Sequence, residues 1–287
     1  MINAMEELNV INDIDRLFKR DNVLIGMIHL LPLPGSPRYS RTQGMSAVIK
    51  QALKEAEQLI TAGFDGFIVE NAWDIPFVKQ EDLGPETPAA LAVVVSMLRK
   101  QFPTVRIGVN CLANAVQVSV AVAAAADGDF VRANQWVNAY VANEGFIEGE
   151  AGKVSRHRRS IDAGNVSVWA DVHVKLGSHA ITADRSLAQQ AKDAAWFDAN
   201  ALIVTGERLG DLPLTEHLIE IGGATSLPIV VGSGVRVDNL SLIFQHAQAV
   251  IVGSSIKVGG VWHGAMDSGV LAELVAERNV ISASRIE

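Results

Sequence analysis

The sequence predicts an α/β fold: a (β/α)8 TIM barrel preceded by an extra N-terminal helix. Short apolar segments with the composition of β-strands alternate with segments of helical periodicity along the 287 residues. Eight such pairs, at the spacing of βα units, favour a closed barrel over a doubly wound sheet. No GxGxxG sequence follows the first strand, so we do not expect a dinucleotide-binding half.

The elements are predicted in the following order. Residues 6–20 form an amphipathic helix of the kind that closes the bottom of a barrel. The strands are residues 23–29, 66–71, 106–110, 130–134, 166–175, 201–205, 228–231 and 249–252. The helices between and after them are residues 46–62, 88–101, 114–126 with Asn114 as the cap, 156–161, 185–199, 215–224, a helix from 237, and 267–277.

Two connections are longer than a barrel requires. Residues 30–44 and 135–149 are long enough to close over the barrel mouth as lids. In that case Trp136, Tyr140 and Phe146 would be apolar cover and would not belong to the core.

The composition excludes several classes of function. A formal charge of −8 argues against nucleic acid as a partner, and no apolar run is long enough for stable insertion into a membrane. A single cysteine, Cys111, excludes an internal disulfide and suits a reducing compartment. We therefore expect a cytoplasmic homo-oligomer, with residues 1–287 as one domain: a helical cap over 1–21 and the barrel over 22–280.

The segment 166–175, VSVWADVHVK, carries the strongest functional signal. Read with the period of a strand, its valines and Ala170 share one face, while Asp171, His173 and Lys175 share the other. In a parallel barrel the outward face packs on helices, and inward residues near the carboxyl end of a strand meet the substrate. We predict that Asp171, His173 and Lys175 face inward as catalytic residues; the alternative is an ion cluster that only fills the barrel.

Polar residues also end the neighbouring strands. Each has a simple structural explanation when taken alone, as a core histidine, a turn former or an ion-pair partner. Together they place polar groups around one end of the barrel, where active sites of this fold are built. We predict catalytic roles for His29 and Glu70 and substrate binding by Asn71, Asn110, Arg132, Asn134 and Thr205.

The last two strands end differently, in small residues. Gly232, Ser233 and Gly234 follow one strand, and Gly253 and Ser254 follow the other. Such turns offer backbone N–H groups to an anion, and many barrels bind phosphate at this position. We predict a phosphate site here, with Lys257 as a nearby positive charge or as a snorkelling side chain.

Several motifs resemble those of the BtpA/SgcQ family. They include GMIHLLPLPGSP at 26–37, GFDGFIVEN at 63–71, IGVNCLANA at 107–115, FVRANQW at 130–136, NEGFIEGEAGKVSRHR at 143–158, WADVHVK at 169–175, LIVTG at 202–206, VGSGVRVDNL at 231–240 and IVGSSIK at 251–257. The resemblance implies a barrel of the ribulose-phosphate-binding type with a Gly-Ser phosphate site, and no settled reaction. The family takes its names from a cyanobacterial factor needed for photosystem I accumulation and from a member of a sugar-utilisation gene cluster. Here Lys175 is not followed directly by the family's histidine, since His179 is displaced, and the last helix lacks the family's arginine.

Two classes of function remain open. As an enzyme, the protein would act on a small, sugar-phosphate-like metabolite by acid–base isomerisation or epimerisation. Lys175 could instead form a Schiff base in an aldol reaction, or Glu70, Asp171 and His173 could hold a divalent metal, so the reaction is that of an isomerase, lyase or hydrolase. The alternative is a non-catalytic assembly or regulatory factor, as in photosystem I biogenesis.

Overall fold

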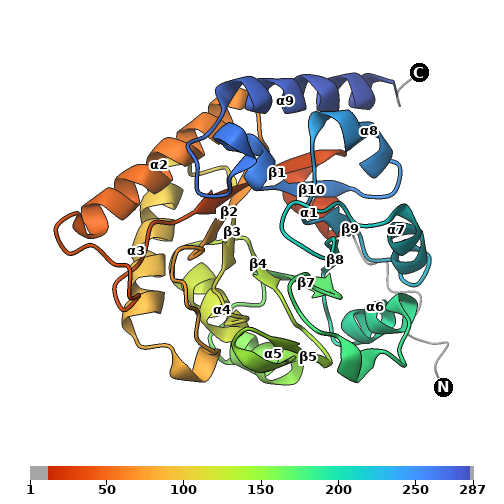
Figure 1. The fold of residues 1–287 in the computed structure, drawn as a ribbon, viewed down its shortest axis with the longest axis horizontal. Coiled ribbons are helices and arrows are strands. Elements are labelled where there is room, and N and C mark those ends of the chain that lie inside the picture. Colours follow the sequence, from red (N-terminus) through yellow and green to blue (C-terminus); the bar gives the residue numbers. More distant parts are fainter. Residues whose placement is uncertain (1–11, 285–287) are drawn as a thin grey trace.

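A computed structural model describes residues 12–284 of the chain. Its parallel strands form a closed barrel in the order β1-β10-β9-β8-β7-β4-β3-β2, with helices on the outside (Figure 1). The strands are β1 (Val23–His29), β2 (Gly66–Glu70), β3 (Arg106–Asn110), β4 (Phe130–Ala133), β7 (Ser167–Val172), β8 (Ala201–Val204), β9 (Ile229–Val231) and β10 (Ala249–Val252). The predicted fold class is confirmed.

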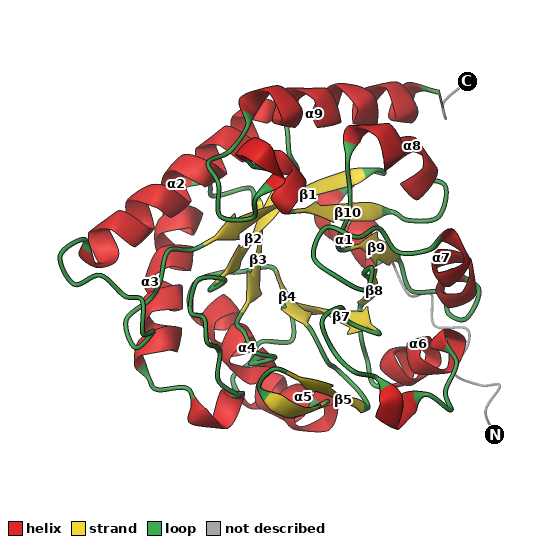
Figure 2. Ribbon diagram, in the orientation of Figure 1, coloured by secondary structure: helices red, strands yellow, loops and turns green. Residues whose placement is uncertain are grey.

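The helices surround this ring, as the colouring by secondary structure in Figure 2 shows. They are α1 (Asp13–Phe18), α2 (Gly44–Ala62), α3 (Glu86–Gln101), α4 (Val116–Ala125), α5 (Ala151–Ser160), α6 (Leu187–Trp196), α7 (Thr215–Gly222), α8 (Leu240–Ile243) and α9 (Ser268–Ala283). Most of the predicted helices begin or end within a few residues of these bounds. None of the helices in the described part is both long and apolar enough to cross a bilayer.

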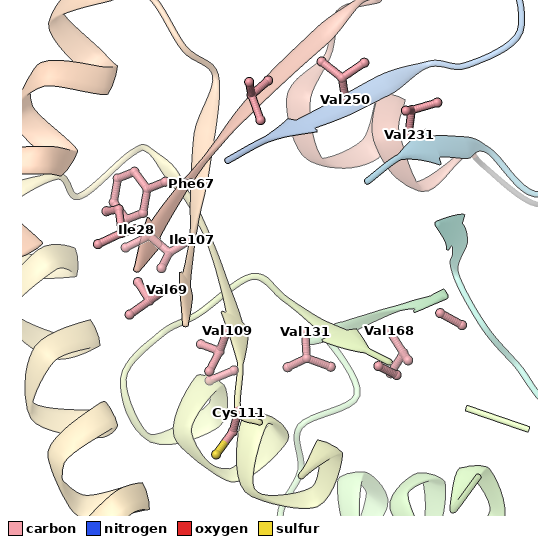
Figure 3. Close-up of a cluster of buried hydrophobic side chains, with 14 of the residues drawn as sticks. Ile28, Phe67, Val69, Ile107, Val109, Cys111, Val131, Val168, Val231 and Val250 are labelled. Atoms are coloured by element: carbon pink, nitrogen blue, oxygen red, sulfur yellow. The ribbon is translucent and has the colours of Figure 1, made fainter. Parts of the chain in front are cut away.

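The alternation along each strand builds two separate apolar layers. Outward residues such as Phe67, Ile107 and Val131 pack against the helices, as Figure 3 shows for one part of this layer. Inward residues fill the lower barrel, where the rings of Phe130 and Trp169 stack with their centroids 3.9 Å apart. The barrel is therefore packed at its amino end, and polar residues occupy the other end.

The helix α1 closes the packed end, as predicted. Ile14 and Leu17 join the inward layer of the barrel. Asp13 accepts hydrogen bonds from Ser167 Oγ at 2.9 Å and from Trp169 Nε1 at 2.8 Å, so the plug is also fixed by polar contacts. Residues 6–11 of the predicted helix lie outside the described residues.

The start of α4 differs from the prediction. Asn114 is not its cap: the residue has a left-handed φ of 52°. Its side chain instead pairs with the backbone of Gln135, accepting from the N–H at 2.8 Å and donating to the C=O at 3.0 Å. Asn114 therefore ties the end of β3 to the end of β4.

The segment 135–149 is also different from the expected lid. It forms an antiparallel hairpin of β5 (Ala139–Ala142) and β6 (Gly145–Glu148). Trp136 is fully buried in the core and donates from Nε1 to the carbonyl of Phe197 at 2.8 Å. Tyr140 is buried as well, whereas Phe146 is exposed. The expectation that Trp136 and Tyr140 are cover and not core was therefore wrong.

Candidate active site

An ion pair lies at the carboxyl end of the barrel, between neighbouring strands β4 and β7. Asp171 Oδ2 accepts from Arg132 Nη2 at 2.9 Å and from Asn134 Nδ2 at 3.2 Å. Both members of the pair are buried. Burial raises the pKa of Asp171, and the guanidinium of Arg132 opposes that rise. Asp171 faces inward as predicted, and its oxygens already serve as the counter-charge of Arg132.

Lys175 lies beyond the end of β7, and its amine is close enough to the Arg132–Asp171 pair to be influenced by both charges. Its backbone N–H donates to Thr205 Oγ1 at 3.0 Å, which links the loop after β7 to the end of β8. Burial and the charge of Arg132 lower the pKa of Lys175 to about 8, against the opposing effect of Asp171, Glu70 and Asp211. Its amine can therefore be neutral or charged near physiological pH. Thr205 holds the backbone that carries it.

His173 does not follow the predicted strand phase. The strand β7 ends at Val172, and His173 takes a left-handed φ of 57° that breaks the alternation. The residue is exposed, and its ring stacks on His179 with centroids 3.8 Å apart. Desolvation and the nearby charges of His179 and His217 lower the pKa of His173 to about 4. Its ring thus belongs to a cluster with the displaced histidine of the family pattern.

His29 and Glu70 face each other at the ends of β1 and β2. His29 Nδ1 lies 2.9 Å from the carbonyl of Trp262, a contact that places the proton of a neutral ring on Nδ1. The other nitrogen, Nε2, lies 3.9 Å from Glu70 Oε1. Burial lowers the pKa of His29, against the opposing effect of Glu70. A neutral His29 therefore presents an unprotonated Nε2 beside a carboxylate.

Two asparagines add hydrogen-bond acceptors to the rim, the ring of polar side chains at the carboxyl end of the barrel. Asn110 donates from Nδ2 to Glu70 Oε2 at 2.6 Å, just as Asn134 donates to Asp171. These contacts fix each amide, and the remaining oxygens, Asn110 Oδ1 and Asn134 Oδ1, are buried with no hydrogen-bond partner in the described part of the chain. Buried acceptors of this kind are suited to hydroxyl or N–H donors of a ligand.

The side chain of Asn71 hydrogen-bonds to two loops and not to the other polar residues of the rim. It accepts from the backbone N–H of Leu112 at 2.7 Å and donates to Asp74 Oδ2 at 3.0 Å. Both ends of its amide are thus engaged in joining the loops after β2 and β3.

The turns after β9 and β10 lie near this rim. Ser233 Oγ donates to the carbonyl of Asp211 at 2.7 Å and accepts from the N–H of Gly206 at 2.8 Å, so its hydroxyl holds a neighbouring loop. Gly234 has a φ of 70°, and a Cβ there would lie 2.2 Å from the backbone nitrogen of Leu212. Only glycine fits that approach.

Gly253 is different, because it is the open glycine of the two turns. A Cβ on Gly253 would lie 3.5 Å from His29 Cε1, an ordinary contact. Within residues 12–284 its N–H makes no backbone hydrogen bond. The turn after β10 therefore offers a backbone donor beside His29, with Ser254 next in the chain.

Lys257 lies elsewhere than predicted. Its Nζ is 2.7 Å from Glu55 Oε1 on α2, and both residues are buried. The ammonium is therefore neutralised behind the turn and does not stand beside Gly253 as a free charge. The 3-10 turn Ser254–Ile256 separates it from the end of β10.

The metal set considered from the sequence is not brought together. Among the described residues, no three His, Cys, Asp or Glu side chains are grouped so that they could hold a metal ion. Asp171 is bound by Arg132 and Asn134, and His173 stacks outside the strand.

Two contributors to this rim gave no signal in the sequence. Trp262 supplies the carbonyl that orients His29 across 233 residues of chain, and Asp211 contributes to the electrostatics of Lys175 from the loop after β8. Neither residue stands directly at the end of a predicted strand, because each lies several residues further along the loop. Only the folded loops bring them to the site.

The comparison with known sequences decides the family. Residues 20–279 match the BtpA family. The chain belongs to the BtpA family. An uncharacterized mitochondrial protein of Caenorhabditis elegans is 36% identical over 90% of this chain and 94% of its own. The photosystem I biogenesis protein BtpA of Synechocystis is 34% identical over 89% of this chain and 87% of its own.

Solved structures with the same fold are much more distant in sequence. Tryptophan synthase subunit alpha from Legionella pneumophila has a TM-score of 0.59 and 15% identity, covering 94% of this chain and 99% of that one. The (S)-3-O-geranylgeranylglyceryl phosphate synthase from Thermoplasma acidophilum, in complex with its substrate sn-glycerol-1-phosphate, has a TM-score of 0.57 and 12% identity over 94% of this chain and 97% of that one. This BtpA-family protein therefore shares the barrel fold of these enzymes.

Proposed function

We propose that this BtpA-family protein is an enzyme that acts on a small, sugar-phosphate-like metabolite by acid–base chemistry. The observation that carries the proposal is Lys175, an amine with a pKa of about 8 beside a buried Arg132–Asp171 pair. A buried ionisable cluster is costly to a fold, and a group whose pKa lies near the working pH is suited to moving protons. The placement at the carboxyl ends of barrel strands supports the same role.

Phosphate is proposed to bind at the turns after β9 and β10. Gly253 leaves space beside the backbone, and its N–H, which makes no backbone hydrogen bond within residues 12–284, supports an anion there. Gly234 would act indirectly, because the space beside it is taken by the backbone of Leu212. Ser233 would act by holding the turn and not by direct contact, since its hydroxyl already bridges Asp211 and Gly206. The complex of the fold relative with sn-glycerol-1-phosphate is consistent with a phosphorylated ligand.

The remaining groups suit the carbon skeleton of such a ligand. The acceptors Asn110 Oδ1 and Asn134 Oδ1 would receive its hydroxyl protons. Glu70 or the neutral His29 would remove a proton from a carbon next to a carbonyl, and the protonated base would return it to the neighbouring carbon. Charged Lys175 would give its proton to the carbonyl oxygen as negative charge develops there, and its neutral amine would then take the proton of the hydroxyl on the neighbouring carbon, so that the oxygen protons balance as well.

The phosphate site is tested by replacing Gly253 with valine. The wild-type melting temperature is expected to rise in inorganic phosphate, by roughly 4–6 °C when phosphate reaches about a hundred times its Kd. Gly253→Val should remove most of this rise because its side chain would occupy the space beside His29. The measurement is a melting curve over a series of phosphate concentrations.

The matched control is Gly222→Val on α7, where a Cβ meets only Ile229 at 3.8 Å. This variant should keep the full response to phosphate. An equal response in Gly253→Val and wild type would contradict phosphate binding at this turn.

Acid–base chemistry and a Schiff base predict different products with borohydride. A Schiff base on Lys175 would be reduced to a stable adduct when substrate is present, whereas proton transfer leaves the lysine unmodified. We expect no adduct in a mass-spectrometric digest after treatment with a pool of phosphorylated sugars. An adduct on the peptide that contains Lys175 would replace the acid–base proposal with aldol chemistry.

A second candidate function is non-catalytic, and it has one specific support. A relative that is 34% identical over most of its length is named a photosystem I biogenesis protein. An assembly factor would use its surface, so substitutions of Lys175, Glu70 and His29 would not affect its role. The two functions are separated by complementation in a host that lacks the gene, using variants of these three residues.

We also propose that the protein works in the cytoplasm as a single-domain homo-oligomer. The single buried thiol of Cys111 and the formal charge of −8 support the location. Exposed apolar side chains on α6 and α9, among them Trp196 and Val280, support self-association. Sedimentation velocity would test it, and a monomer at micromolar concentration would contradict it.

A further inference from the structure

A cavity of about 200 Å³ lies beside His29, between α2 and the loop that joins β10 to α9. Two of its walls differ in chemistry. Trp73, Trp262 and His263 form an aromatic wall, and Gln51 and Glu55 of α2 form a polar wall. His29 lines this cavity and also faces Glu70 at the rim, so the two sites share one side chain.

The polar wall presents hydrogen-bond acceptors. Gln51 donates from Nε2 to the carbonyl of His29 at 3.2 Å, and this contact fixes which end of its amide is free. Gln51 Oε1 and Glu55 Oε2 are both buried and have no hydrogen-bond partner among residues 12–284. They lie one helical turn apart on the same face of α2. An unpaired buried acceptor is unfavourable, so a ligand that donates a hydrogen bond to each of the two atoms would be stabilised there.

The charge of the polar wall is already balanced. Glu55 Oε1 is paired with Lys257 Nζ at 2.7 Å, and Lys54 stands at the edge of the cavity. The wall therefore carries no uncompensated negative charge that would favour a cationic ligand. It favours a neutral group with two adjacent donors.

The aromatic wall offers a platform for a flat ring. The rings of Trp73 and Trp262 are 4.8 Å apart between centroids and tilted by 49°, and His263 lies 5.2 Å from each. These rings contact one another, so a ligand would stack on the cluster and not between its members. A planar heterocycle is stabilised by such stacking, whatever its substituents, because its whole face can contact the rings.

We propose that this cavity binds a neutral, planar nitrogen heterocycle with adjacent N–H donors, such as a nucleobase. An exocyclic amino group and a ring N–H match the two acceptors on α2, while the ring face lies on Trp73 and Trp262. A sugar matches less well, because each hydroxyl also brings an acceptor and both free atoms of the wall are acceptors.

The position of the cavity suggests the class of substrate. Gly253, in the turn proposed to bind phosphate, and Trp262, in the aromatic wall, both lie next to the ring of His29. A ligand that carries both a phosphate and a heterocycle could therefore reach both sites past His29. This assignment of a nucleotide-like substrate rests on the proposed function, whereas binding of the ring alone does not.

Tryptophan fluorescence tests the ring site directly. Trp196 is 78% exposed on α6, so the titrations use the Trp196→Phe protein to remove its signal. The probes are adenine, cytosine, adenosine, ribose and inorganic phosphate. At least one base is expected to quench the fluorescence to saturation, and adenosine should do so where adenine does. Ribose should have no effect.

Two variants and a matched control assign the signal. Glu55→Gln keeps an oxygen for Lys257 and turns a donor amide toward the cavity, so affinity for the base should fall by about tenfold or more, the loss expected for one buried hydrogen bond. Trp73→Leu removes a stacking partner from a loop and should abolish most of the quenching. Glu57→Gln is the same change at an exposed position of α2 and should alter nothing.

The outcomes separate the two proposals. Quenching by ribose but by no base, or quenching by bases that survives Glu55→Gln and Trp73→Leu together, would overturn the ring site. Stabilisation by phosphate with no response to any base would overturn the ring site and leave the proposed function standing. Quenching by a base without stabilisation by phosphate would do the reverse.

Discussion

Replacing Lys175 with methionine is expected to abolish turnover and, at neutral pH, to make the protein more stable. Burial and Arg132 lower the pKa of Lys175 from about 10.5 to about 8, so the fold disfavours the charged amine that it must carry at pH 7. Methionine has a similar length and no charge. Relief of this cost is worth on the order of 1–3 kcal/mol, while loss of the proton-transferring group should lower the rate by roughly 10²–10⁴.

The pH dependence of stability gives the sign of this effect. Between pH 8 and 10.5 the unfolded chain holds the Lys175 proton and the folded protein releases it, so this residue makes wild-type stability rise with pH in that window. The variant lacks that rise. Its advantage over wild type should therefore be largest below pH 8 and should shrink toward pH 10.5 in urea unfolding.

Turnover is measured by incubating a pool of phosphorylated sugars and nucleotides with the protein and following each compound by mass spectrometry. Lys192→Met, an exposed lysine of α6, is the matched control and should change neither activity nor stability. A Lys175→Met protein that turns over the same compound as wild type would exclude Lys175 from the chemistry. One that is less stable than wild type at pH 7 would contradict the buried-charge argument.

The parts of the fold that depend on periodicity were predictable from the sequence. Outward residues such as Val168 and inward residues such as Asp171 follow from the alternation along β7, because a strand with one face on helices needs that pattern. The N-terminal plug followed for the same reason, since Ile14 and Leu17 recur at helical spacing.

Features that depend on backbone turns or distant partners were not predictable. The strand pattern of β7 runs on through His173 and Lys175 in the sequence, but a left-handed residue at His173 ends it. Histidine is only modestly enriched in that conformation, so the alternation of apolar and polar residues outweighed it in the prediction. Lys257 stands three residues past the Gly253–Ser254 turn, yet its charge is paired with Glu55, about two hundred positions earlier in the chain. The hairpin β5–β6 and the burial of Trp136 were missed because the segment was read as a loop from its length.

Replacing Arg132 with methionine is expected to cause the largest loss of stability of any single change at the rim. Arg132 is the charged partner of Asp171, and Asn134 supplies only a neutral donor. The variant would bury an unpaired carboxylate, a change that typically costs about 3–5 kcal/mol. Urea unfolding at pH 7.5 measures this cost.

The stability of the same variant should rise as the pH falls, which is the opposite of the dependence that Lys175 contributes. This pH dependence shows whether the variant loses stability through its unpaired charge or through lost packing. Burial already raises the pKa of Asp171, and removal of the opposing guanidinium would raise it further. A group whose folded pKa lies above its unfolded pKa stabilises the protein at low pH and loses that effect as pH rises through the folded value. The Arg132→Met protein should therefore regain stability as the pH falls from 7.5 toward 5.

The double variant Arg132→Met/Asp171→Leu has no buried charge at this position, so it should recover most of the loss at pH 7.5 and show little of this pH response. If the single and double variants were equally unstable at pH 7.5, packing of the Arg132 side chain, and not its charge, would be what holds β4 and β7 together at the mouth.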